Sequence, residues 1–446
     1  MTDTSNITNG QLVRNATPAA ASGPEHVSEP TDYDAILLAG FGGPEGQDDV
    51  IPFLRNVTRG RGIPEERLEE VATHYRHFGG VSPINEHNRE LKAALEAELE
   101  RRGIDLPVIW GNRNWQPYMA DAVREADERG FRKLIAVATS AYSSYSSCRQ
   151  YREDFAMALD ATGLEGTMQI DKVRQFFDHP GFVQPFIDGV RDALVKARAE
   201  NEGLDLSTEV QVLFATHSIP STDAAKSGPE ARGFDADGAY AAQHKAVAEV
   251  VMAAAEAALD LDLPEGGGTT VPWQLVYQSR SGPPSMPWLE PDINDAIDDL
   301  AGGPTRAVVI VPLGFVSDHM EVMWDLDEEA LETSEKNGFW ATRTPTPGID
   351  PNYVTGLVDL VLERVEGTPV DDRPHRDPEH PPDLCRGPRR PRRGAPEGHA
   401  RGRAPRRDGP RSLVRRVPPG LLRERAPRVQ ARRLGIGAVG AWRHSE

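Results

Sequence analysis

Two short stretches of this chain carry residue types from which a metal-binding or proton-transfer site can be built. The first, ATHSIP at 215–220, places His217 directly after an apolar run. The second, SDHME at 317–321, places His319 and Glu321 after another such run. A histidine at the end of a buried strand can be neutral at pH 7 and is then free to accept a proton or bind a metal. For His217 alone, the simpler alternative stays open that it only hydrogen-bonds its own turn.

Carboxylates continue the second stretch at a regular spacing. Glu321, Asp325 and Glu329 recur at i, i+4 and i+8, which aligns them on one face of a helix. Like charges at this spacing repel one another, so an isolated helix does not favour them. One interpretation is a solvated acidic face. The other is a track for protons or a cation, since carboxylates and imidazole together suit metals such as Fe²⁺.

The elements that must position these side chains alternate along the chain. Strand-like apolar runs are expected at 34–39, 107–110, 134–139, 210–215, 274–277 and 307–312. Helical patterns are expected at 85–102, 118–129, 181–200, 241–259 and 294–301. Such alternation predicts an α/β fold with parallel sheets flanked by helices. Ligands of open α/β sheets sit at the carboxyl ends of strands, where ATHSIP and SDHME both lie.

The ordered body is long for one unit of this kind, so we expect two α/β lobes. The predicted divisions are a disordered leader at 1–31, an N-terminal lobe at 32–180 and a C-terminal lobe with the metal site at 181–345. A C-terminal helix within 346–370 is expected to pack back on the body. The remaining residues, 371–446, form an Arg- and Pro-rich tail.

Charge is distributed unevenly between body and tail. Residues 371–446 contain 20 Arg, no Lys and nine acidic residues, which gives this segment a net charge of +11. Since the net charge of the whole chain is −19, residues 1–370 have a net charge of −30. The acidic body argues against nucleic-acid binding. The tail is expected to be disordered; it is either a solvated extension or the product of a shifted reading frame. With no apolar run long enough to span a membrane, no signal peptide and two cysteines, we expect a cytoplasmic protein.

Five stretches together resemble ferrochelatases, the enzymes that insert ferrous iron into a porphyrin. They are ILLAGFGGPEG, RHFGGVSPIN, GNRNWQPYMADAV, ATHSIP and PLGFVSDHMEVMWDLDEE, in the family's order between about residues 33 and 365. The resemblance implies two Rossmann-like lobes with a porphyrin cleft between them. The wording of AYSSYSSCRQYRED is similar to the actinobacterial branch, whose substrate is coproporphyrin III and whose product is afterwards decarboxylated to haem.

The resemblance also implies roles for individual residues. His217 and Glu321 face each other across the porphyrin centre, where they bind iron, accept the pyrrole protons, or both. Asp325 and Glu329 extend Glu321 into a polar track, and His319 orients the metal-binding groups together with its neighbour Asp318. Residues that match the family's porphyrin-binding neighbourhoods are Ser82, Tyr151, Tyr75 and Arg113. Further candidates for contacts with propionates are Arg149 and Arg152.

Actinobacterial relatives typically hold a [2Fe–2S] cluster on four cysteines. Cys148 fits the first of them, but the only other cysteine here is Cys385. Because the cluster needs four thiolates, either it is absent or the tail replaces the family's C-terminus.

The expected function is insertion of Fe²⁺ into coproporphyrin III by a monomer. Coproporphyrin III is the expected partner, and the downstream coproheme decarboxylase is a candidate second one; whether the product passes directly to it stays open. A protoporphyrin IX ferrochelatase, or a non-catalytic porphyrin or haem carrier on the same fold, is the alternative. The carrier has no need of His217 and Glu321 together with the carboxylate row, so their joint presence counts against it.

Overall fold

The structure is a computed structural model of the chain. It describes residues 29–60, 62–228, 234, 236–259, 261, 269–281, 285–369 and 372–374. The predicted leader and tail lie almost wholly outside these residues, as does Cys385. Within the described ranges, no helix has both the length and the apolar character needed to cross a membrane.

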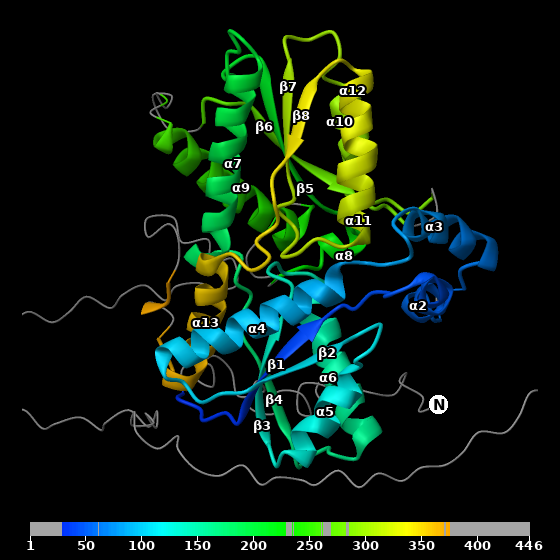
Figure 1. The fold of residues 1–446 in the computed structure, drawn as a ribbon, viewed down its shortest axis with the longest axis vertical. Helices are drawn as coiled ribbons and strands as arrows, with labels where there is room; N and C mark the ends of the chain where they lie inside the picture. The colour runs from blue at the N-terminus through cyan, green and yellow to red at the C-terminus, as the bar shows by residue number, and fades with distance from the viewer. Residues whose placement is uncertain are drawn as a thin grey trace, which may run out of the picture. The chain divides into compact units, whose positions relative to one another are not determined.

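Two four-stranded sheets, each with only parallel pairing, organise the described chain (Figure 1). The first has the order β2 (Val108–Asn112), β1 (Ala35–Gly40), β3 (Lys133–Ala138), β4 (Gln169–Lys172). The second repeats this order with β6 (Trp273–Gln278), β5 (Val210–His217), β7 (Ala307–Val311), β8 (Trp340–Arg343). The predicted α/β fold with two Rossmann-like sheets is confirmed. The prediction omitted β4 and β8, which are short edge strands with polar residues in QIDK and WATR.

Burial on both faces explains why the strands read as continuous apolar runs. All six residues of β1 are buried. Ile36 and Leu38 face one core, while Ala35, Leu37 and Ala39 face another, as the two-residue period of a strand requires.

Helices cover both faces of each sheet. The first sheet packs against α4 (Ile84–Arg102) and α13 (Pro351–Glu366) on one face and against α5 (Met119–Glu128) and α6 (Gln150–Thr162) on the other. The second sheet packs against α7 (Pro180–Glu200) and α9 (Gly238–Ala258) on one face and α10 (Ile293–Asp298) and α12 (Leu331–Lys336) on the other. Shorter helices are η4 (Gln47–Asp49), α8 (Ser221–Ala224) and α11 (Met320–Val322). Two π-helices, η5 (Tyr145–Arg149) and η7 (Met323–Ala330), occupy equivalent places in the two halves, after β3 and after β7.

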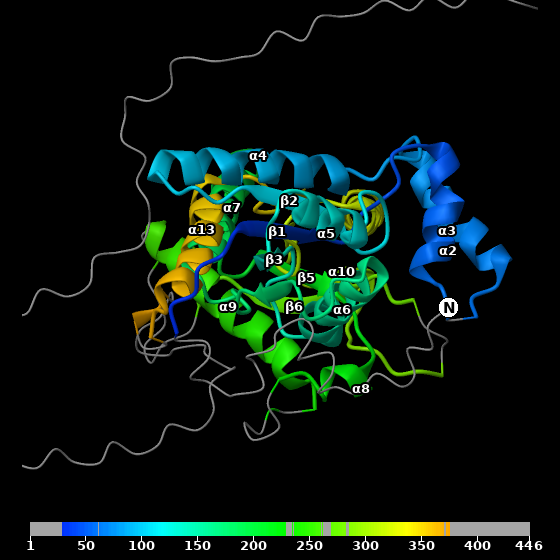
Figure 2. The ribbon, with the colours of Figure 1, turned by 90° about the horizontal axis from the view of Figure 1, so that it is seen from below.

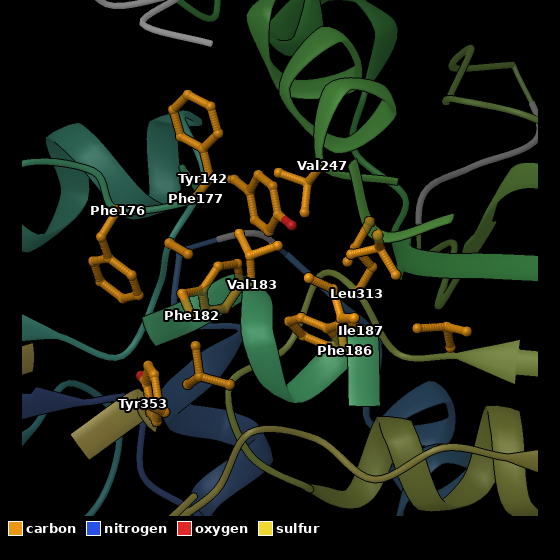
Figure 3. Close-up of a cluster of buried hydrophobic side chains, with 14 of the residues drawn as sticks. Tyr142, Phe176, Phe177, Phe182, Val183, Phe186, Ile187, Val247, Leu313 and Tyr353 are labelled. Carbon is orange, nitrogen blue, oxygen red and sulfur yellow. The ribbon is translucent and has the colours of Figure 1, made fainter. Parts of the chain in front are cut away.

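One continuous apolar core joins the two halves. Phe182 and Phe186 of α7 lie in it beside Tyr142 from the first half, Leu313 from the second and Tyr353 of α13 (Figure 3). The helix that follows the second sheet therefore packs back against the first. A buried ion pair fixes it there, because the guanidinium of Arg364 lies 3.0 Å from Asp171 on β4.

A helical hairpin between β1 and β2 stands to one side of the sheets, and both views show it apart from α13 (Figures 1 and 2). It consists of α2 (Val50–Val57) and α3 (Glu65–His77). Its small core of Phe53, Leu54 and Tyr75 also contains Met320, which belongs to the second half. The hairpin therefore contacts the segment that carries SDHME.

We expect Phe182→Ala to lower the free energy of unfolding by about 3–5 kcal/mol, because it opens a cavity in the core shared by both halves. Urea denaturation followed by circular dichroism measures the change. Val195→Ala is the control on the same helix, since Val195 is 51% exposed and its truncation should change stability by no more than about 0.5 kcal/mol. Equal losses in the two variants would contradict a shared core at Phe182.

Candidate active site

The topology of the second sheet brings ATHSIP and SDHME together. From β5 the chain passes to β6 on one side, then crosses to β7 on the other side of β5. The carboxyl ends of β5 and β7 thus lie at the point where the connections diverge, which is where open α/β sheets form a ligand crevice. His217 is the last residue of β5, and the loop from Gly314 to His319 leaves β7 beside it.

The ring of His217 is held in one orientation by its neighbour. Its Nδ1 hydrogen-bonds the carbonyl oxygen of Ser218. A carbonyl has no proton to give, so Nδ1 carries the hydrogen and a neutral ring has its lone pair on Nε2. That Nε2 lies 3.6 Å from Oε2 of Glu321, with both side chains partly exposed. The structure thus brings the acceptor nitrogen of His217 and the carboxylate of Glu321 together, while their places on either side of a porphyrin centre stay a prediction.

His319 serves the backbone that carries Glu321. Its Nδ1 accepts the N–H of Glu321 at 3.2 Å and so caps α11. Burial lowers the pKa of His319, which agrees with a neutral ring whose Nδ1 is an acceptor. His319 thus contacts the backbone amide of Glu321, and its role in orienting the metal-binding groups stays a prediction.

Arg343 of β8 links the loop before Glu321 to the π-helix η7 through ion pairs with both. Its guanidinium lies 3.1 Å from Asp318 and also forms a two-pronged contact with Asp327. Thr346 donates a further hydrogen bond of 2.9 Å to Asp318. Planar two-pronged contacts of this kind fix direction as well as distance, so the SDHME loop and η7 are held in one arrangement.

The carboxylate row lies on α11 and the π-helix η7, where the prediction placed an ordinary helix. In a π-helix the backbone hydrogen bonds join residues i and i+5. The side chains of Trp324 and Glu329, also five residues apart, are joined by a hydrogen bond of 2.8 Å that Nε1 of Trp324 donates. Glu321 and Glu329 are exposed, whereas Asp325 between them is partly buried.

Burial raises the pKa of Asp325 to about 7. The hydroxyl of Ser279 opposes the shift by donating to the carboxylate, and the charges of Glu321 and Glu329 reinforce it. A carboxyl group that titrates near neutral pH can both take up and release a proton under working conditions.

Gln278 and Ser279 are site residues that the sequence reasoning missed. Nε2 of Gln278 donates to Asp325 at 3.2 Å and to the carbonyl of Glu321 at 3.1 Å. Ser279 has φ 61°, the only positive value outside glycine among the residues that the structure describes. The strand-end rule that singled out His217 applied equally to the predicted strand at 274–277, directly before this pair.

A cavity of about 100 Å³ opens beside the row and is walled by both halves of the molecule. Its lining residues are Phe41, Phe53, Leu54, Val57, Val71, His74, Tyr75, Met320, Glu321, Trp324 and Asp325. The ring of His74 stacks on Trp324 with centroids 4.0 Å apart, so α3 and η7 touch across the rim. Burial raises the pKa of Tyr75, which keeps its hydroxyl protonated beside the carboxylates.

Of the four predicted porphyrin-binding residues, the described cavity wall contains Tyr75. Arg113 is instead buried, with Nε 2.6 Å from Asp154 and its guanidinium 4.1 Å above the Tyr151 ring. Tyr151 is likewise buried, at 3% exposure. Ser82 is also buried and packs against Gly43, which follows the carboxyl end of β1. The porphyrin-binding roles of these three residues stay predictions.

Cys148 lies partly buried in η5 as a free thiol. With two cysteines in these 446 residues, the chain cannot supply the four thiolates of a [2Fe–2S] cluster. Nor do any three His, Cys, Asp or Glu side chains in the described ranges group closely enough to hold a metal. We therefore assign no step to a cluster.

Comparison with known proteins decides the family. The family model for ferrochelatase matches residues 33–365. The chain belongs to the ferrochelatase family. Among curated members, it is 70% identical to the coproporphyrin III ferrochelatase of Leifsonia xyli over 80% of this chain and 91% of that one.

More distant members of the family agree. Identity is 57% to the coproporphyrin III ferrochelatase of Tropheryma whipplei, over 77% of this chain and 85% of that one. Identity is 51% to the coproporphyrin III ferrochelatase of Streptomyces coelicolor, over 76% of this chain and 87% of that one. The solved structure of SirB from Bacillus subtilis with Fe³⁺ aligns at a TM-score of 0.42 and 11% identity, over 75% of this chain and 96% of that one, a likeness too weak to carry an argument.

We expect Asp325→Asn to change how stability depends on pH. Since the folded pKa of Asp325 is raised to about 7, from about 3.9 in an unfolded chain, its stabilisation is complete below pH 4 and is lost as the pH rises to 7. The variant lacks this loss, so its stability relative to the wild type should rise by about 1–3 kcal/mol between pH 4 and pH 8. Urea melts at both values measure it.

Glu332→Gln, which removes an exposed carboxylate of α12, is the control and should show no such trend. A constant stability difference between Asp325→Asn and the wild type at both pH values would show that Asp325 titrates normally.

Proposed function

We propose that this ferrochelatase inserts Fe²⁺ into coproporphyrin III to give Fe-coproporphyrin III. The single observation that carries the proposal is the pair formed by Nε2 of His217 and the carboxylate of Glu321, 3.6 Å apart at the sheet's crevice. The names of the relatives at 70%, 57% and 51% identity support the choice of porphyrin. Protoporphyrin IX is the alternative substrate, and the assay below distinguishes the two.

Metal insertion exchanges two pyrrole protons for one Fe²⁺, so the site needs proton acceptors and a place for the ion. The Nε2 lone pair of His217 and the carboxylate of Glu321 can each either accept one of the two protons or ligate the ion, since Fe²⁺ accepts imidazole and carboxylate ligands. We infer that one proton passes from Glu321 to Asp325, whose raised pKa of about 7 makes it a suitable next acceptor. Glu329 then offers an exposed carboxylate at the rim, held by Trp324.

The cavity must widen to admit a macrocycle. Pockets for drug-sized ligands measure roughly 300–1,000 Å³, several times the 100 Å³ found here. Its wall includes α3 and η7, which touch through His74 and Trp324. We infer that separation of these two elements would admit the porphyrin beside Glu321, which lines the cavity.

Four propionates require basic partners on an acidic protein. Arg113 is paired with Asp154 and Arg149 with Glu153. Arg152 forms no ion pair within the described ranges, and its Nε is buried without a hydrogen-bond partner. We therefore infer that Arg152, of the three predicted arginines, is the one free to bind a propionate.

The surroundings of the reaction stay at the level of proposal as well. We propose that the enzyme works in the cytoplasm as a monomer. Its product keeps all four propionates, so a coproheme decarboxylase is the proposed next enzyme.

We expect His217→Ala to lower the rate of Fe²⁺ insertion by about 100-fold or more, and Glu321→Gln by a comparable factor, because each removes a proton acceptor. The measurement is loss of porphyrin fluorescence under anaerobic conditions, with coproporphyrin III and protoporphyrin IX offered separately. Glu332→Gln is the matched control on a neighbouring helix and should keep the wild-type rate.

Turnover of coproporphyrin III alone would establish the substrate, and turnover of protoporphyrin IX alone would overturn the choice of coproporphyrin III. A wild-type protein that binds both porphyrins tightly but metallates neither would favour the carrier. Wild-type rates in both active-site variants would contradict the assignment of His217 and Glu321.

A further inference from the structure

A chain of buried polar side chains lies behind His217, and neither the sequence reasoning nor the proposed mechanism uses it. Its members on α9 are Tyr240, Gln243 and His244, of which Gln243 and His244 are fully buried. Buried polar groups are costly unless they are hydrogen-bonded, and a satisfied network admits few alternative arrangements.

The hydrogen bonds of this network connect His244 to the backbone of His217 through Thr216 and Tyr240. Burial lowers the pKa of His244 to about 3, so its ring is neutral. Nδ1 of His244 donates to the carbonyl of Tyr240 at 2.7 Å, which leaves Nε2 to accept the hydroxyl of Thr216 at 3.0 Å. The phenol of Tyr240 then shares its proton between Thr216, at 2.7 Å, and the backbone carbonyl of His217, at 3.0 Å.

The same turn of α9 also contacts the first half of the molecule. The N–H of Ser143 donates to Oε1 of Gln243 at 2.8 Å, and Nε2 of Gln243 donates back to the Ser143 hydroxyl at 2.9 Å. The ring of His244 stacks on Tyr142 with centroids 3.5 Å apart. Tyr142 lies near Val247 and Phe182 in the core that joins the halves (Figure 3).

The loop that leads to SDHME is held against the network as well. A Cβ at Gly314 would collide with the hydroxyl of Thr216, so the loop passes directly over that side chain. The N–H of Gly314 donates to the carbonyl of Ala215 at 3.1 Å. The positions of His217 and of the loop before Glu321 therefore depend on the same few atoms.

These contacts matter because the substrate cavity is walled by both halves. Phe41, Phe53 and Tyr75 come from the first half, while Glu321 and Trp324 come from the second. Apolar packing between the halves is non-directional and restricts their register less sharply than hydrogen bonds do. The paired hydrogen bonds between Gln243 and Ser143 are directional and restrict that register further.

We propose that Gln243 and Tyr240 are positioning residues for metal insertion, which set the distance of His217 from a porphyrin bound against the first half. The proposal rests on the proposed function. A displacement of about 1 Å at a reacting group can cost roughly a hundred-fold in rate, so we expect kcat to fall at least about ten-fold in Gln243→Met and in Tyr240→Phe. The KM values for coproporphyrin III and Fe²⁺ should change less than about two-fold, because neither residue lines the cavity.

Tyr353→Phe is the matched control for Tyr240→Phe. Tyr353 is a buried tyrosine of the same core, and its hydroxyl has no hydrogen-bond partner in the described chain. Its kcat should equal that of the wild type. A double-mutant cycle in kcat between Ser143→Ala and Gln243→Met tests the contact between the halves, and the effect of Ser143→Ala should disappear in the Gln243→Met background.

The outcomes separate the two proposals. A wild-type protein that does not metallate coproporphyrin III would remove the proposed function itself. With an active wild type, unchanged kcat in Gln243→Met and Tyr240→Phe would overturn the positioning role. The role would also be overturned if both variants lost kcat only in proportion to a lowered Tm. Additive effects in the cycle would overturn the link between the halves.

Discussion

The hydrogen bond from Nδ1 of His217 to the carbonyl of Ser218 is the constraint on which the proposed chemistry depends. It leaves Nε2 as the ring's only available acceptor and points that atom at Glu321. The backbone that makes this bond is fixed in turn. The N–H of Ser218 donates to the backbone carbonyl of Gln278 on β6 at 2.8 Å, and the Ser218 hydroxyl donates to the backbone carbonyl of Leu289 at 2.8 Å. The direction of one lone pair is thus determined by two adjacent parallel strands and the loop beyond them.

The fold supports this constraint in two ways, through the order of its strands and through the packing of its core. Both sheets have the same strand order, and the pair of His217 and Glu321 lies where the connections of the second sheet diverge. The first sheet contributes the apolar wall of the cavity through the hairpin of α2 and α3, which reaches Met320. The common core around α7 and the return of α13 to the first sheet keep these two contributions together.

Much of this arrangement could be predicted from the sequence, for identifiable reasons. Strands buried on both faces are apolar throughout, so six of the eight were visible as runs, while β4 and β8 were too short and polar. His217 and Glu321 could be found because each follows such a run. The π-helical turn could not be foreseen, since i, i+4 spacing is equally compatible with an ordinary helix. Nor does sequence reveal that Arg113 is already paired with Asp154, because those residues are 41 positions apart.

The tautomer of His217 tests the central claim most directly. ¹⁵N NMR of histidine-labelled protein at pH 8, with His217 assigned by comparison with His217→Gln, reports which ring nitrogen carries the proton. We expect Nδ1 of His217 to show the shift of a protonated nitrogen and Nε2 that of an unprotonated one. The reverse pattern, with the proton on Nε2, would contradict a site in which His217 presents its lone pair to the pyrrole protons and the iron.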